Sequence, residues 1–123
     1  HFHQVAIQEE ILARRIAIVN DAGQEVVLLS ASEDDNGAMV IYNKNGTPVA
    51  LLGADEVGGA IGIYNKDGNM VATMGADEFG GIMGLSDKDG DYVVSMMAGG
   101  EYGGIEIYNK NGTPVAYMGA SID

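Results

Sequence analysis

Acidic side chains have the strongest chemical potential in this sequence, and they occur in short clusters. The segment Asp87-Lys-Asp-Gly-Asp91 begins like a calcium-binding loop, in which alternate carboxylates coordinate the ion. Its glycine stands at the wrong position, and no glutamate closes a loop of about twelve residues. An equivalent segment, Asn43-Lys-Asn-Gly, can turn the chain without any metal. We therefore expect a turn at 87–91 rather than a metal site.

Two acidic doublets, Asp55-Glu56 and Asp77-Glu78, invite comparison with a pair of catalytic carboxylates. Acid–base catalysis by two carboxylates needs a cleft that holds them at a set separation. Repetition at an exposed turn instead predicts solvated groups, which in an oligomer would form acidic rings that attract cations weakly.

Histidine and cysteine chemistry is almost absent from the chain. The two histidines, His1 and His3, lie at the terminus, and we expect them to reflect processing rather than a metal pair. No internal histidine is present to activate a serine, and the chain has no cysteine for a disulfide or a thiolate metal site. We therefore predict that the protein is not an enzyme, and we assign no catalytic, cofactor-binding or metal residues.

Three tyrosines share one position in a repeating pattern: Tyr42, Tyr64 and Tyr108, with Ser86 as the exception. A ladder of aromatic rings can bind sugars by stacking. It also stabilises a half-buried sheet face by packing between strands, which is the interpretation we favour.

The element that positions all these residues is a repeat, marked by the turn glycines Gly23, Gly46, Gly68, Gly90 and Gly112. These glycines recur with a nearly constant period of roughly 22 residues, and a period of this size indicates a repeat architecture. We divide the chain into a segment 1–14 and a β-repeat domain 15–123, with repeats 15–37, 38–59, 60–81, 82–103 and 104–123.

Each repeat predicts two short strands joined by a tight turn. Large apolar residues stand seven and five positions before the turn glycine, so they share one face of a strand. On the returning strand, positions four, six and eight after the glycine also share a face and read small, large, small. The eighth position is always alanine, at Ala31, Ala54, Ala76, Ala98 and Ala120. Such a column indicates that another part of the structure approaches closely there.

The turns Asn-Lys-x-Gly are typical of a type I turn closed by a bulge. Their first side chain can accept bonds from the backbone ahead, and their glycine tolerates a positive φ. We therefore expect the two strands of each repeat to be antiparallel neighbours, with positive φ at Gly68 and Gly90.

Residues 1–14 differ from the repeats, because they are rich in helix formers and contain neither glycine nor proline. The sequence predicts a short helix here. An isolated helix of about 12 residues is marginal, so it would pack on the first repeat or on copies of itself in a coiled coil.

Charge and hydropathy limit the partners. The 123 residues include 6 basic and 18 acidic ones, for a net charge of −12, which argues against a nucleic-acid partner. No apolar run approaches the roughly 18 residues of a membrane span, so we expect no membrane insertion.

A single open sheet of these strands would leave its apolar face in water. Two architectures solve this: three chains whose sheets wrap around a common axis as a triangular β-prism, or one chain coiled as a β-solenoid. We favour the trimeric prism, because the hairpin-type turns suit antiparallel strands better than a coil.

The repeated unit Ile-x-Ile-Tyr-Asn-Lys-x-Gly-x-x-Val-Ala-x-Met-Gly-Ala-Asp-Glu resembles the Gly-rich β-repeat stalks of trimeric phage tail fibres and of bacterial surface or secreted fibre proteins. The resemblance covers residues 15–123 and implies a structural role at the cell surface, outside the cell or on a virion. It carries over no functional residues. The alternative function is an adhesin-like module that binds glycans or a surface through the tyrosines or the acidic turns.

Overall fold

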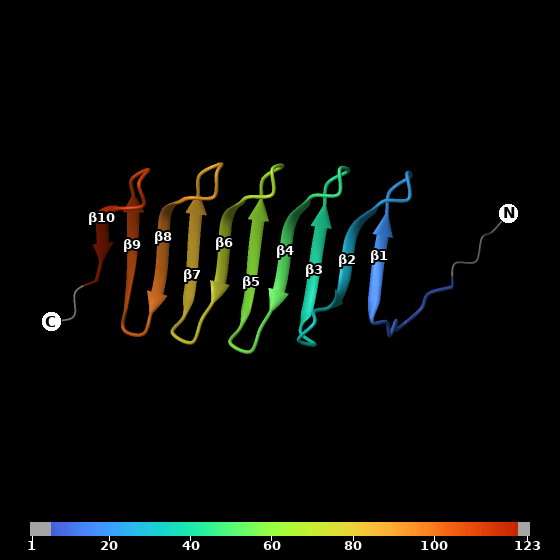
Figure 1. Ribbon diagram of the computed structural model, residues 1–123. Coiled ribbons are helices and arrows are strands. Elements are labelled where there is room, and N and C mark those ends of the chain that lie inside the picture. The colour runs from blue at the N-terminus through green and yellow to red at the C-terminus, as the bar shows by residue number, and fades with distance from the viewer. Residues whose placement is uncertain (1–5, 121–123) are drawn as a thin grey trace.

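Ten antiparallel strands form one open sheet in the computed structural model, which describes residues 6–120 (Figure 1). The strands are β1 (Arg15–Val19), β2 (Glu25–Ala31), β3 (Gly37–Tyr42), β4 (Pro48–Ala54), β5 (Gly59–Tyr64), β6 (Met70–Ala76), β7 (Gly81–Ser86), β8 (Tyr92–Gly99), β9 (Tyr102–Tyr108) and β10 (Pro114–Gly119). Each strand pairs with the next in the sequence, so the sheet is a simple meander. The prediction of an all-β fold built from two-stranded repeats is confirmed.

The tight turns at one end of the strands have the predicted geometry. The five turn glycines have φ between 76° and 93°, with Gly68 at 85° and Gly90 at 93°. The pairing register also shifts beside each turn, for example between Ile41 and Tyr42, which is the expected bulge. In the second turn the amide of Asn43 donates to the carbonyl of Thr47, and that of Gly46 donates to the carbonyl of Asn43.

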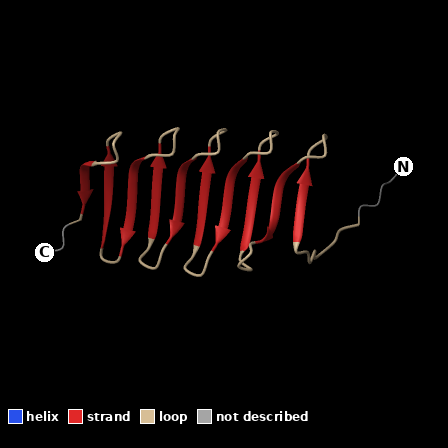
Figure 2. Cartoon of the chain, viewed as in Figure 1, coloured by secondary structure: helices blue, strands red, loops and turns tan. Residues whose placement is uncertain are grey.

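The predicted N-terminal helix is wrong for the part of segment 1–14 that the structure describes. Residues 6–14 are irregular, and their apolar side chains are exposed, with Ile7 at 88% and Leu12 at 87%. So short a segment makes too few hydrogen bonds to offset helix nucleation unless a tertiary contact supports it. The cartoon contains only strands and loops, and none of residues 6–120 belongs to a helix that could span a membrane (Figure 2). His1 and His3 lie outside the described residues.

One sheet has no second layer to cover it. Between residues 6 and 120, no large hydrophobic side chain is buried, and the only buried residues are Gly62 and Gly84. The accessible surface of the chain is 9640 Å², whereas a compact protein of 12.8 kDa exposes about 6,300 Å². The chain does not coil, so the alternative of a single-chain solenoid is wrong, and the uncovered face becomes the central feature of the molecule.

Candidate functional site: an uncovered apolar face and two charged ends

The uncovered face consists of three parallel rows of side chains, which we call the apolar face. Its middle row pairs large residues in register across all ten strands: Ile16, Leu29, Met39, Leu52, Ile61, Met74, Met83, Met96, Ile105 and Met118. The row nearer the Asn-type turns alternates large with smaller residues: Ile18, Val27, Ile41, Ala50, Ile63, Ala72, Leu85, Val94, Ile107 and Ala116. The third row holds only alanine and glycine: Ala31, Gly37, Ala54, Gly59, Ala76, Gly81, Ala98 and Gly103. The predicted sharing of faces within each strand is confirmed.

Water reaches the large side chains of this face along its whole length. The exposed fraction is 37% for Ile61, 40% for Met83 and 69% for Met118. A groove of about 560 Å³ runs over the methionines of the C-terminal half, between Met74 and Met118. Ten strands spaced by about 4.8 Å, each about 20 Å long, give the face an area on the order of 950 Å². A stable interface needs about 800 Å² from each partner, so the apolar face is large enough to form one.

Part of the close approach predicted at the alanine column comes from the chain's own loops. A Cβ atom added to Gly58 would lie only 2.8 Å from that of Ala76. Gly80, with φ of 149°, lies close to Ala98, and a Cβ there would meet the Ala98 carbonyl oxygen. The loops at 55–58 and 77–80 therefore lean across to the next repeat, and Gly100 reinforces this by donating its amide hydrogen to the carbonyl of Phe79.

The opposite face of the sheet is covered in places by aromatic rings. A Cβ atom added to Gly62 would lie 3.2 Å from the Tyr64 ring, and one added to Gly84 would lie 2.8 Å from the Tyr92 ring. The Tyr117 ring covers Gly104 in the same way, with a Cβ there 3.0 Å from the ring. Glycine leaves a gap in a strand surface, and the flat ring of a neighbouring tyrosine fills it. Packing therefore accounts for Tyr64, as we favoured from the sequence.

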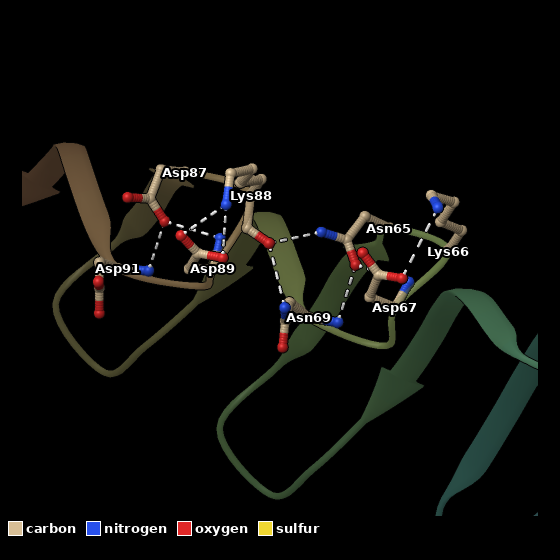
Figure 3. A network of polar contacts seen from close by, with 8 residues as sticks. All are labelled: Asn65, Lys66, Asp67, Asn69, Asp87, Lys88, Asp89 and Asp91. Carbon is tan, nitrogen blue, oxygen red and sulfur yellow. Dashed lines mark hydrogen bonds and ion pairs between the residues drawn. The ribbon is translucent and has the colours of Figure 1, made fainter.

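The turns are held together by the side chain that begins each one. The Oδ1 atom of Asn65 accepts hydrogen bonds from the amides of Asp67 and Asn69, at 3.1 and 3.0 Å. The third and fourth turns are also joined, because the side-chain amides of Asn65 and Asn69 both donate to the carbonyl oxygen of Lys88 (Figure 3). These contacts connect neighbouring repeats at the turn end of the sheet.

Asp87 takes the role of asparagine in the fourth turn. Its Oδ1 atom accepts bonds from the amides of Asp91 and Asp89, and these bonds lower the pKa of Asp87 below its ordinary value of 3.8. Lys88 pairs with Asp89 at 2.9 Å, which raises the pKa of the lysine. The carboxylate of Asp87 is therefore used to build the turn. Among residues 6–120, no three histidine or acidic side chains come together as metal ligands would.

The acidic doublets also stabilise their own loops. The Oδ1 atom of Asp55 accepts hydrogen bonds from the amides of Val57 and Gly58, each at 2.9 Å. Asp77 does the same for Phe79 and Gly80, at 2.8 and 2.9 Å. The two doublets lie in different loops, and the glutamate of each is exposed to solvent.

The lysines lie at one end of the strands, together with five aspartates, and the charged residues in the loops at the other end are acidic only. All four lysines lie in the Asn-type turns, which form the turn end at 20–24, 43–47, 65–69, 87–91 and 109–113. The loops at the other end, which we call the acidic end, lie at 32–36, 55–58, 77–80 and 100–101. They contain no basic residue and eight acidic ones: Glu33, Asp34, Asp35, Asp55, Glu56, Asp77, Glu78 and Glu101. The exposed acidic turns were predicted from the sequence. The confinement of the lysines to the opposite end was not, although their positions within the repeat would have revealed it.

One cleft breaks the regular turn end. It has a volume of about 380 Å³ and lies between the fourth and fifth turns, lined by Tyr92, Tyr108, Asp91 and Lys110 among others. Asp91 occupies the position of Asn69 in the previous repeat, and a carboxylate has no N–H to donate to the carbonyl of the next turn. The link that closes the gap between the third and fourth turns is therefore missing here.

No family model and no curated protein matches the sequence. The function is therefore argued from the apolar face, the two charged ends and the cleft.

Proposed function

We propose that the chain is a non-enzymatic structural module of a fibre or stalk, which assembles as a homotrimer and spaces or displays other parts. The observation that carries the proposal is the apolar face, which is continuous over ten strands and has no covering layer among residues 6–120. Large exposed apolar surfaces mark places of association. The chain exposes about 3,300 Å² more surface than a compact protein of this mass, and covering the apolar face would remove part of this excess.

A second copy of the chain suits this face because the rows repeat with the period of the sheet itself. Three sheets around one axis form a triangular prism whose interior is lined by the middle row of each copy. The repetition also favours an elongated shape, since further repeats lengthen such a prism without changing its cross-section. A rigid spacer of this kind suits a surface fibre, so the proposal includes a location outside the cell, on the cell surface or on a virion.

The proposal is tested by placing a charge on the apolar face. Met83→Glu puts a carboxylate into the middle row, whereas the control variant Thr73→Glu puts one on the opposite face, where Glu106 stands naturally in the same row. We expect Met83→Glu to weaken association by at least about 100-fold, because a buried unpaired charge is costly. Sedimentation velocity of both variants measures this.

The wild-type chain should also show a melting temperature that rises with protein concentration, since folding and association are then coupled. If Met83→Glu sediments and melts as the wild type does, the apolar face is not an interface and the proposal fails.

The second candidate is an adhesin-like module that binds glycans, and the cleft beside Tyr92 and Tyr108 favours it. Tyr92 is 53% exposed, so its ring can stack on the C–H groups of a sugar ring. Asp91 and Lys110 line the same cleft and can form hydrogen bonds with the hydroxyl groups of that sugar. A glycan array tests this function. Binding that is lost in Asp91→Asn would support it, since asparagine restores the donor that closes the gap between turns.

A further inference from the structure

We infer that the copies associate around an axis parallel to the rows of the apolar face, so that the turn end of each copy lies against the acidic end of the next. This inference rests on the proposed trimer and specifies its partner surface, which is a second copy of the same chain. The surface has two parts, the corner where two sheets meet and the charged loops outside it.

Symmetry alone brings the two ends together. A rotation about an axis parallel to the rows leaves every strand at the same height along the axis. Each sheet then forms one side of the prism, and each corner joins the turns of one copy to the loops of its neighbour. Because the contact joins two different surfaces and closes after three copies, it is heterologous and cyclic. An axis parallel to the strands would instead join β10 of one copy to β1 of the next, and it would gather the acidic ends of all copies at one end of the assembly.

Charge favours the first arrangement over the second. The loops of the acidic end carry eight carboxylates and no basic residue, and Arg14 and Arg15 lie beside them only at the start of β1, so two such ends repel each other. Lys66 and Lys88 lie near aspartates of their own turns, at 3.9 and 2.9 Å. Lys44 and Lys110 stand in turns without any acidic residue, and neither forms an ion pair within residues 6–120. These two turns therefore present a positive charge that a neighbouring copy can match.

The heights along the axis also agree. The turn that holds Lys44 joins β3 to β4, and the nearest loops at the acidic end join β2 to β3 and β4 to β5. Those loops contain Glu33, Asp34, Asp35, Asp55 and Glu56. The turn that holds Lys110 joins β9 to β10, and the nearest loop at the acidic end, which contains Glu101, joins β8 to β9.

Side-chain size fits the same corner. The row beside the turn end alternates isoleucine or leucine with valine or alanine, whereas the row beside the acidic end contains only alanine and glycine. Sheets converge at the corners of a triangular prism, so large side chains there require small ones opposite. Ala54, Ala76 and Ala98 remain exposed beside their own loops, and a neighbouring copy can contact them.

Zero-length cross-linking with a carbodiimide tests the inference on the whole chain. The reagent joins a lysine to a carboxylate only where the two are in contact. Within one chain the two ends are separated by strands of about 20 Å, so a link between them must join two copies. Mixing unlabelled with ¹⁵N-labelled chains before assembly identifies such links by mass spectrometry.

We expect links from Lys44 to the loops at 32–36 or 55–58, and from Lys110 to Glu101. Lys44→Gln should remove the links to the loops at 32–36 and 55–58 and leave the assembly trimeric. The matched variant Lys66→Gln should leave those links in place. Links confined to the turn end, either within one turn or between turns of two copies, would overturn the inference. A trimer by mass without links between opposite ends would refute the corner and leave the proposed function intact, whereas a monomer would refute both.

Discussion

The turn glycines offer a test of the repeat that depends on backbone conformation alone. Gly68 has φ of 85° and no atom within 4 Å of an added Cβ, and Gly37 in β3 has equally open space without a positive φ. Substitution of either residue by alanine therefore creates no clash. Alanine also occurs in the row of Gly37, for example at Ala31, so Gly37→Ala stays within the side-chain size of that row. The comparison therefore tests whether an L-residue tolerates the backbone conformation at Gly68.

The two substitutions should change the free energy of unfolding in opposite directions. Alanine at a left-handed position costs roughly 1–2 kcal/mol, so Gly68→Ala should destabilise the fold by about 1 kcal/mol after the reduced entropy of the unfolded chain is included. Gly37→Ala should stabilise the strand by about 0.5–1 kcal/mol. The difference between the variants is then about 2 kcal/mol, or several degrees in melting temperature.

Urea denaturation followed by circular dichroism measures this difference. Both variants must be compared at one protein concentration, because association contributes to the apparent stability. If Gly68→Ala is as stable as Gly37→Ala, the left-handed turn does not constrain the repeat and the reasoning about turn glycines is refuted.

Three further substitutions address the turn acceptor, the alanine column and the aromatic cover. Bonds to Asp87 lower its pKa, so its contribution to stability is present above its ordinary pKa of 3.8 and is lost as pH falls through the lowered pKa. The melting temperature of Asp87→Asn should therefore rise relative to that of the wild type at pH 3 but not at pH 7. If the two proteins differ in melting temperature by the same amount at both pH values, the role of the Asp87 carboxylate is contradicted. Ala76→Leu should cost roughly 1–3 kcal/mol in urea unfolding, because Gly58 leaves no room for a larger side chain; an unchanged midpoint would refute the contact. Tyr64→Ala should cost about 1 kcal/mol by uncovering Gly62, and a loss no greater than that of Tyr102→Ala would count against the packing role.

Local chemistry made the turns and the strand order predictable. Asparagine at the first turn position and glycine at the fourth favour one type of hairpin, and the short period of the turn glycines leaves room for only two strands between successive turns. With every connection short, each strand can pair only with its neighbours in sequence. The register followed in turn, because the apolar residues at seven and five positions before Gly46 must share a face.

Features that depend on tertiary structure were harder to predict. The alanine column indicated a close approach, but not that Gly58 and Gly80 make it, because the lean of a loop depends on the twist and spacing of the strands beneath it. The helix expected over 1–14 rested on residue propensities. These are too small to stabilise a short segment, and residues 6–14 do not form one.

The aromatic cover over glycine was missed for a different reason. Gly62 and Tyr64 are two residues apart in one strand and so share a face, which is a signal that the sequence contains. We made no prediction for the glycine at this position. In the structure, the Tyr64 ring occupies the space that the missing side chain leaves.

The mass of the wild-type chain in solution tests the central claim most directly. Light scattering coupled to size-exclusion chromatography should give three times the 12.8 kDa of one chain, together with a strand-rich circular dichroism spectrum. That result would mean that the apolar face is covered by other copies. A well-folded species of 12.8 kDa would contradict the account, because the face would then remain in water and the chain would be stable without the partners that the proposal requires.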